Sequence, residues 1–316
     1  MDAVQQLNYQ PFARAVGRPR RARQAGPWSI GVVLAAARYK FSDPYWSPVL
    51  DGVDAELRRS GCHLIFAASP EETDDLQRRE TLVKGSYDGL ILLGDFVDRL
   101  DLIEDGRTVV VEGEDQLRWR GEPRVDIVTA EKRRSIYALV DHLAMLERRQ
   151  IGFLGPPAER DERAEAFPHA LQRAGLAFDP DLVIASAWAI DKAYAAVSAF
   201  LGQDPKIDAL ICASDELALG AMRAARERDL RLPQDLAVTG FDDVPFAASV
   251  HPALTTARLS RADVGAVAAQ RMIERLDDPG CPVSIQFVPT TLIVRASCGE
   301  TVQPQEFRSN QVSIDP

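Results

Sequence analysis

Short apolar segments alternate with longer amphipathic segments along most of this 316-residue chain. Runs such as Trp28–Ala35, Gly89–Leu93 and Ala209–Ala213 have the length and composition of buried strands. Between such runs, Pro48–Ser60 and Glu131–Leu146 show the apolar spacing of helices. This alternation predicts parallel sheets with helices on both faces. Because the elements are too many for one sheet, we predict an α/β fold of two doubly wound lobes, with a ligand cleft where strand ends face each other.

Charge is distributed unevenly along the chain, and this suggests its division into parts. Residues 1–28 hold five arginines and one acid, a net charge of +4, whereas the remainder carries −14. A basic arm on an acidic body is expected when only one end of a protein contacts phosphate, although a solvated tail has the same composition. We therefore predict a basic arm at 1–27, a two-lobe domain at 28–298 and a polar tail at 299–316.

Several functional classes have no support in the sequence. The four cysteines and four histidines lack metal-ligand spacing, and no phosphate-binding loop or catalytic motif is present. No run of apolar residues is long enough for a secretory signal or a membrane span. We expect no enzyme activity, no cofactor, no metal and no membrane contact, and we expect a cytoplasmic location.

Polar side chains stand where two of the predicted strands end. Ser214 and Asp215 follow one strand, and Asp242 follows the strand Ala237–Gly240. Ligands of open α/β sheets bind outside the carboxyl ends of the strands, and carboxylates there can accept two hydroxyl protons. We predict ligand contacts for all three residues. The alternatives are an N-cap at Asp215, a solvent-facing Ser214 and a turn residue at Asp242.

Aromatic and cationic side chains also follow predicted strands. Tyr45 and Trp46 could stack on the apolar face of a sugar ring or pack into the core. Asp43, just before them, is a candidate ligand residue or an N-cap. Arg163 could bridge two hydroxyl groups with its planar guanidinium group, or form a surface ion pair with Asp161 or Glu162.

Three sequence blocks together resemble the effector-binding domain of the LacI/GalR family of bacterial transcription regulators. They are Ile211–Gly220, Gly240–Val244 and His251–Thr256. The resemblance implies that Asp43–Trp46 corresponds to an Asn-Pro-aromatic-aromatic element and that Arg163 points into the cleft. The chain departs from the family pattern in having Ala166 for a glycine and Ser214 for an asparagine, so the effector is not fixed by the resemblance.

The resemblance also implies a function and partners. It implies a homodimer whose cleft binds a small sugar or related metabolite, with effector binding changing the affinity for operator DNA. A cytoplasmic sensor that binds sugar but not DNA is the alternative. A search of the sequence before Met1 for a helix-turn-helix would distinguish the two.

The N-terminal segment carries the candidate DNA contacts. Residues 1–11 resemble the last helix of the family's helix-turn-helix domain, and we expect the rest of that domain to be missing. Residues 12–16 then stand where the family has a hinge helix that inserts a leucine into the minor groove. The predicted DNA contacts are Arg14, Val16, Arg18 and Arg20. Without a complete helix-turn-helix, we expect weak, salt-sensitive DNA binding without sequence preference.

Overall fold

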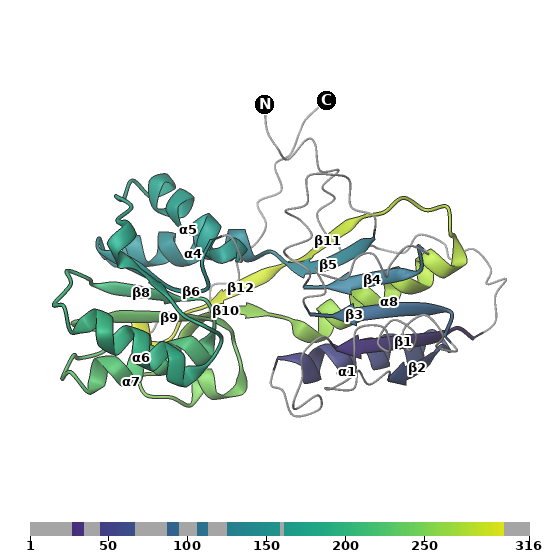
Figure 1. The fold of residues 1–316 in the computed structure, drawn as a ribbon, viewed down its shortest axis with the longest axis horizontal. Helices are drawn as coiled ribbons and strands as arrows, with labels where there is room; N and C mark the ends of the chain where they lie inside the picture. Colours follow the sequence, from purple (N-terminus) through teal and green to yellow (C-terminus); the bar gives the residue numbers. More distant parts are fainter. Residues whose placement is uncertain are drawn as a thin grey trace, which may run out of the picture. The chain divides into compact units, whose positions relative to one another are not determined.

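The computed structural model describes residues 27–34, 45–66, 87–94, 106–112, 125–158 and 161–299 (Figure 1). Some of the sequence predictions lie outside these residues. These are the ligand contact of Asp43, a helix expected at 74–84, the basic arm up to residue 26, the tail after Gly299, and the DNA contacts of Arg14, Val16, Arg18 and Arg20.

The described residues form two compact units, each built on a six-stranded sheet. Unit 1 comprises residues 1–131 and 260–289, and unit 2 comprises 132–259 and 290–316. The chain therefore passes from one unit to the other three times. The prediction of two parallel-sheet lobes is confirmed by these two sheets.

All the described strands of unit 1 run parallel in the order β11-β5-β4-β3-β1-β2. The buried β5 was not predicted, because its short run between two charged residues gave little apolar signal. The elements of unit 1 are β1 (Ser29–Leu34), α1 (Trp46–Arg59), β2 (His63–Phe66), β3 (Gly89–Leu93), β4 (Thr108–Val111), β5 (Asp126–Ala130), α8 (Arg261–Asp277) and β11 (Ile285–Val288).

The sheet of unit 2 has the order β12-β10-β9-β8-β6-β7, and only β12 runs antiparallel to its neighbour. Helices α4 and α5 lie on one face of this sheet, and α6 and α7 lie on the other (Figure 1). The helices of unit 2 are α4 (Lys132–Met145), α5 (Glu162–Arg173), α6 (Ile190–Leu201) and α7 (Asp215–Arg226). Its strands are β6 (Ile151–Gly155), β7 (Val183–Ala185), β8 (Ala209–Cys212), β9 (Ala237–Asp242), β10 (Thr255–Leu259) and β12 (Thr290–Ile293).

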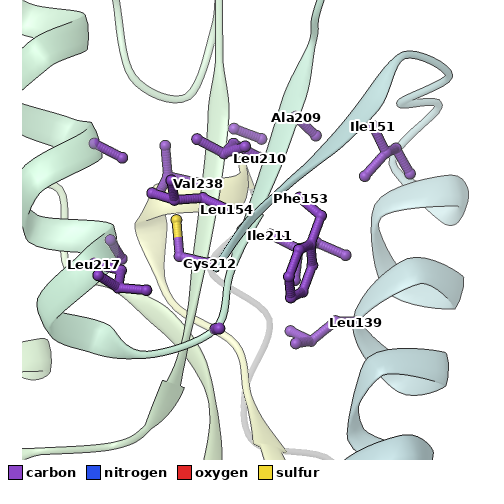
Figure 2. Close-up of a cluster of buried hydrophobic side chains, with 14 of the residues drawn as sticks. Leu139, Ile151, Phe153, Leu154, Ala209, Leu210, Ile211, Cys212, Leu217 and Val238 are labelled. Atoms are coloured by element: carbon purple, nitrogen blue, oxygen red, sulfur yellow. The ribbon is translucent and has the colours of Figure 1, made fainter. Parts of the chain in front are cut away.

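The core of unit 2 is formed by apolar side chains on both faces of its sheet. Phe153 lies toward Leu139 of α4, whereas Cys212 lies toward Leu217 of α7 (Figure 2). Side chains on a strand point alternately to the two faces, so strands covered on both faces must be apolar throughout. This explains the uninterrupted apolar runs from which the strands were predicted.

A buried ion cluster joins α8 to the start of β5 in unit 1. The carboxylate of Asp126 accepts hydrogen bonds from Arg271 Nε at 2.8 Å, Arg275 Nη2 at 2.7 Å and the backbone N–H of Ser284 at 2.8 Å. The two arginines are one helical turn apart, so they present both guanidinium groups to one carboxylate. The cluster fixes the last turns of α8 against the sheet.

Helices α1 and α8 touch backbone to backbone in the same unit. A Cβ atom added to Gly52 would lie 1.9 Å from the carbonyl oxygen of Ala262, and one added to Gly265 would lie 2.0 Å from that of Val49. No real Cβ atom tolerates such distances, and the backbone of a packed helix cannot move aside cheaply. Only glycine permits this crossing.

In the described part of the chain, no helix is long and apolar enough to span a membrane.

Gly265→Ala should lower the free energy of unfolding by about 1–3 kcal/mol or more, because the added methyl group overpacks a backbone contact. Urea denaturation measures this loss. Gly280→Ala is the matched control, since a Cβ atom there would have only an ordinary 3.5 Å contact with Asp278. Equal stability of the two variants would show that α1 and α8 do not pack in this way.

Candidate ligand-binding site

Four neighbouring parallel strands of unit 2 end at the same edge of its sheet. These strands are β6, β7, β8 and β9, and the segments that follow β6, β7 and β8, together with the last residue of β9, carry polar or aromatic side chains. We use the term carboxyl-end cluster for Asp161, Arg163, Trp188, Ser214 and Asp242. The predicted ligand residues Arg163, Ser214 and Asp242 thus come from three different strand ends of one sheet.

Arg163 forms a buried, two-point ion pair with Asp161 at the start of α5. Its Nε donates to Oδ1 of Asp161 at 3.0 Å, and its Nη2 donates to Oδ2 at 2.8 Å. Asp161 is also the N-cap of the helix, since Oδ1 accepts the backbone N–H of Arg163 at 2.8 Å. The ion pair with Asp161, which was one of the alternatives to a ligand contact, is therefore present, but it is buried and not on the surface, since the side chains of Arg163 and Asp161 are 9% and 1% exposed. The ligand contact of Arg163 stays a prediction.

Two aromatic rings lie against the guanidinium group of Arg163. Its Cζ is 4.9 Å from the ring centroid of Trp188 and 4.9 Å from that of Phe241. Phe241 is fully buried in β9, whereas Trp188 is 51% exposed. Contacts of this kind are favourable for a cation and restrict the movement of its side chain.

Trp188 was missed by the sequence analysis, although a signal for it existed. It follows β7 by three residues, so the rule that selected Ser214 and Asp242 also applies to it. A half-exposed indole ring beside a guanidinium group offers an apolar face to a ligand. We therefore add Trp188 to the candidate ligand residues.

Ser214 and Asp215 begin α7 and are both buried. The hydroxyl oxygen of Ser214 caps the helix by accepting the backbone N–H of Leu217 at 3.2 Å. The carboxylate of Asp215 accepts the backbone N–H of Val244 at 2.8 Å and the hydroxyl of Thr256 at 2.6 Å. The cap is therefore Ser214 and not Asp215. The carboxylate of Asp215 therefore already holds two parts of the protein together. Its ligand contact stays a prediction.

Asp242 ends β9 in an unusual backbone conformation. It is 7% exposed, and its φ of 105° lies in a region that side chains other than glycine rarely adopt. Such conformations cost about 1–3 kcal/mol and gather at functional sites. The next residue, Asp243, has a structural role, because its carboxylate pairs with Arg258 Nε at 2.6 Å and with Arg295 Nη2 at 2.7 Å. The ligand contact of Asp242 stays a prediction, now with backbone strain to support it.

Tyr45 and Trp46 lie in unit 1, at the start of α1. Their rings meet edge to face with centroids 4.8 Å apart, and both residues are partly buried. Arg261 lies over the Tyr45 ring, with its Cζ 6.0 Å from the centroid. The two rings thus contact each other, and neither is fully buried in the core. Stacking of both rings on a ligand stays a prediction.

Burial and neighbouring charges shift the pKa values of two titratable groups near these strand ends. Burial by itself would raise the pKa of Asp161, but the charge and hydrogen bonds of Arg163, together with the charge of Lys132, bring that pKa below its ordinary value. Burial, reinforced by Asp215, raises the pKa of the Cys212 thiol well above its ordinary value. Asp161 therefore stays ionised, and Cys212 is the inert apolar residue that its strand position predicted.

Comparisons with known proteins give this arrangement a family. Residues 140–298 match the model of the periplasmic binding protein-like domain family. The ribose operon repressor of Haemophilus influenzae is 26% identical over 304 residues, which cover 94% of this chain and 88% of the repressor.

Two solved structures share the fold. The transcriptional regulator CelR in complex with cellobiose has a TM-score of 0.75 at 23% identity, over 86% of this chain and 85% of that chain. The lac repressor dimer bound to operator and the anti-inducer ONPF has a TM-score of 0.74 at 19% identity, over 87% of this chain and 95% of that chain.

The two parallel sheets and the family match define a periplasmic-binding-protein-like domain of type I, and the chain belongs to that family. More narrowly, it is a transcriptional regulator of the LacI/GalR type. The resemblance read from the three sequence blocks is thereby confirmed, as is the expectation of a regulator and not an enzyme. The stand-alone sensor is correspondingly disfavoured.

Asp161→Asn should make unfolding less dependent on pH in the acid range. Because the pKa of Asp161 is lowered by folding, its ion pair stabilises the protein fully above the unfolded-state pKa of about 3.9, and this contribution is lost as the pH falls through the folded-state value. At pH 6 we expect a loss of about 1.5–3 kcal/mol relative to the wild type, the usual worth of hydrogen bonds to charged groups. The difference should shrink below pH 4 in urea denaturation experiments.

Asp235→Asn is the matched control, because Asp235 forms the same two-point pair with Arg231 but on the surface. Its effect should be smaller than that of Asp161→Asn and should disappear in high salt, since exposed charges are screened. Equal effects of the two variants at every pH would contradict a special role for the buried pair.

Proposed function

We propose that the effector of this regulator is a small hydroxylated, sugar-like molecule that binds at the carboxyl-end cluster. The observation that carries the proposal is the grouping of a half-exposed indole, a fixed guanidinium group and a strained carboxylate at neighbouring strand ends. Support also comes from the relatives, one named for a ribose operon and one solved with cellobiose.

Each member of the cluster matches one part of a sugar. The Trp188 ring suits the apolar C–H face of a pyranose or furanose ring. The carboxylate of Asp242 can accept protons from two adjacent hydroxyl groups, and Arg163 can donate to hydroxyl oxygens. Ser214 is shorter than an asparagine and offers a single rotating hydroxyl group, so this position selects a different substituent from the asparagine of the family pattern.

The proposal extends to DNA and to assembly. We propose that the protein acts in the cytoplasm as a homodimer and that its effector changes its affinity for operator DNA. The lac repressor, which shares the fold, is a dimer on its operator. A ligand can change DNA affinity only if it binds the DNA-competent and DNA-incompetent states with different affinities.

A thermal-shift screen tests the effector class. Sugars, sugar phosphates and nucleobases should be tried on the full chain, because a ligand that binds only the folded state raises the melting temperature. We expect a carbohydrate to stabilise the protein. A melting temperature raised by a purine and by no carbohydrate would refute the proposal.

Asp242→Ala tests the carboxylate with any sugar found in the screen. The loss of a charge-assisted hydrogen bond should weaken binding by about 1.5–3 kcal/mol, or roughly tenfold to a hundredfold, in calorimetry. Asp229→Ala is the control, because Asp229 is an exposed aspartate that also has a positive φ, of 58°, in the same unit. Unchanged affinity in a folded Asp242→Ala variant would assign Asp242 to the turn alone.

A further inference from the structure

The Asp161–Arg163 pair is electrically neutral before any ligand arrives. Both carboxylate oxygens of Asp161 accept hydrogen bonds from the guanidinium group of Arg163. This group also lies against the rings of Phe241 and Trp188. Because Asp161 is 1% exposed and caps α5, it cannot turn away from Arg163 without leaving a helix N-terminus and a buried charge unsatisfied. The positive charge of Arg163 is thus held by the protein itself.

Other charged groups lie near the pair. Lys132, which is buried, acts electrostatically on Asp161. Arg133 pairs with two glutamates of α5: its Nε lies 3.5 Å from Oε1 of Glu162, and its Nη2 lies 3.3 Å from Oε1 of Glu165. Within the carboxyl-end cluster, Asp242 adds a further negative charge. Of the residues that make up the carboxyl-end cluster, Arg163 is thus the one cation, and Asp161 and Asp242 are two carboxylates.

We propose that Asp161 is a specificity-determining residue, which keeps anions away from Arg163 and thereby restricts the effector to uncharged polyols. This inference rests on the proposed sugar-binding function and names its substrate class. A phosphate or carboxylate group near Arg163 would either repel Asp161 in a desolvated site or have to displace it. A neutral hydroxyl group needs neither change. Rejection by a like charge already in place is an ordinary way to build specificity.

Asp161→Asn provides a test that needs no knowledge of the effector. Asparagine keeps an oxygen for the N-cap, and it removes the charge together with one of the two oxygens that accept from Arg163. Inorganic phosphate, titrated at constant ionic strength, should bind this variant of the full chain at least about tenfold more tightly than the wild type. Asp235→Asn should show no gain, because it removes the same charge from an exposed pair with Arg231. A purely structural role of Asp161 would not raise the affinity for phosphate.

Phosphate binding by the wild type as tight as by Asp161→Asn, or an equal gain in both variants, would overturn the proposal. A second measurement needs no variant. Ribose should bind the wild type more tightly than ribose 5-phosphate, and glucose more tightly than glucose 6-phosphate. A preference for either phosphorylated sugar would refute the neutral-effector inference while leaving sugar binding intact. Binding of a purine alone would refute the sugar proposal, and the phosphate titration would still decide the role of Asp161.

Discussion

The carboxylate of Asp215 links three strands of unit 2, and the turn that carries Asp242 depends on it. It follows β8, accepts the backbone N–H of Val244 after β9, and accepts the hydroxyl of Thr256 in β10. A Cβ atom at Gly240 would lie 2.2 Å from Oδ1 of Asp215, so the carboxylate also requires glycine in the neighbouring strand. A buried charge with these hydrogen bonds fixes the turn that carries Asp242.

Two buried aspartate–arginine clusters have different positions and consequences. Asp126 lies at the start of β5 in unit 1 and holds Arg271 and Arg275 of α8 against the sheet. Asp161 follows the end of β6 in unit 2, where ligands of such sheets bind. The same ionic chemistry therefore stabilises packing at one place and determines at the other which charges a ligand can carry.

The pairing of the Arg163 guanidinium group with Asp161 also explains how a regulator can hold an arginine among aromatic rings without attracting every cellular anion. Contact with the rings of Trp188 and Phe241 fixes the plane of the guanidinium group, and the hydrogen bonds to Asp161 fix its edge. A side chain fixed in advance loses little entropy when a ligand binds. Specificity for hydroxyl groups then depends on geometry more than on long-range attraction.

The sequence alone determined the fold class and most strand ends, because strands buried on both faces must be continuously apolar and helices keep a 3.6-residue pattern. It also placed Arg163, Ser214 and Asp242 after strands, and hence at one edge of a sheet. It could not show that Ser214 caps α7 whereas the carboxylate of Asp215 links β8 to the residues of β9 and β10, because the local sequence allows either residue to take either role. The pairing of Arg163 with Asp161, the exposure of Trp188 and the ion cluster of Asp126 were decided by tertiary structure. Each depends on contacts between side chains and elements whose distances and burial are not written in local sequence patterns.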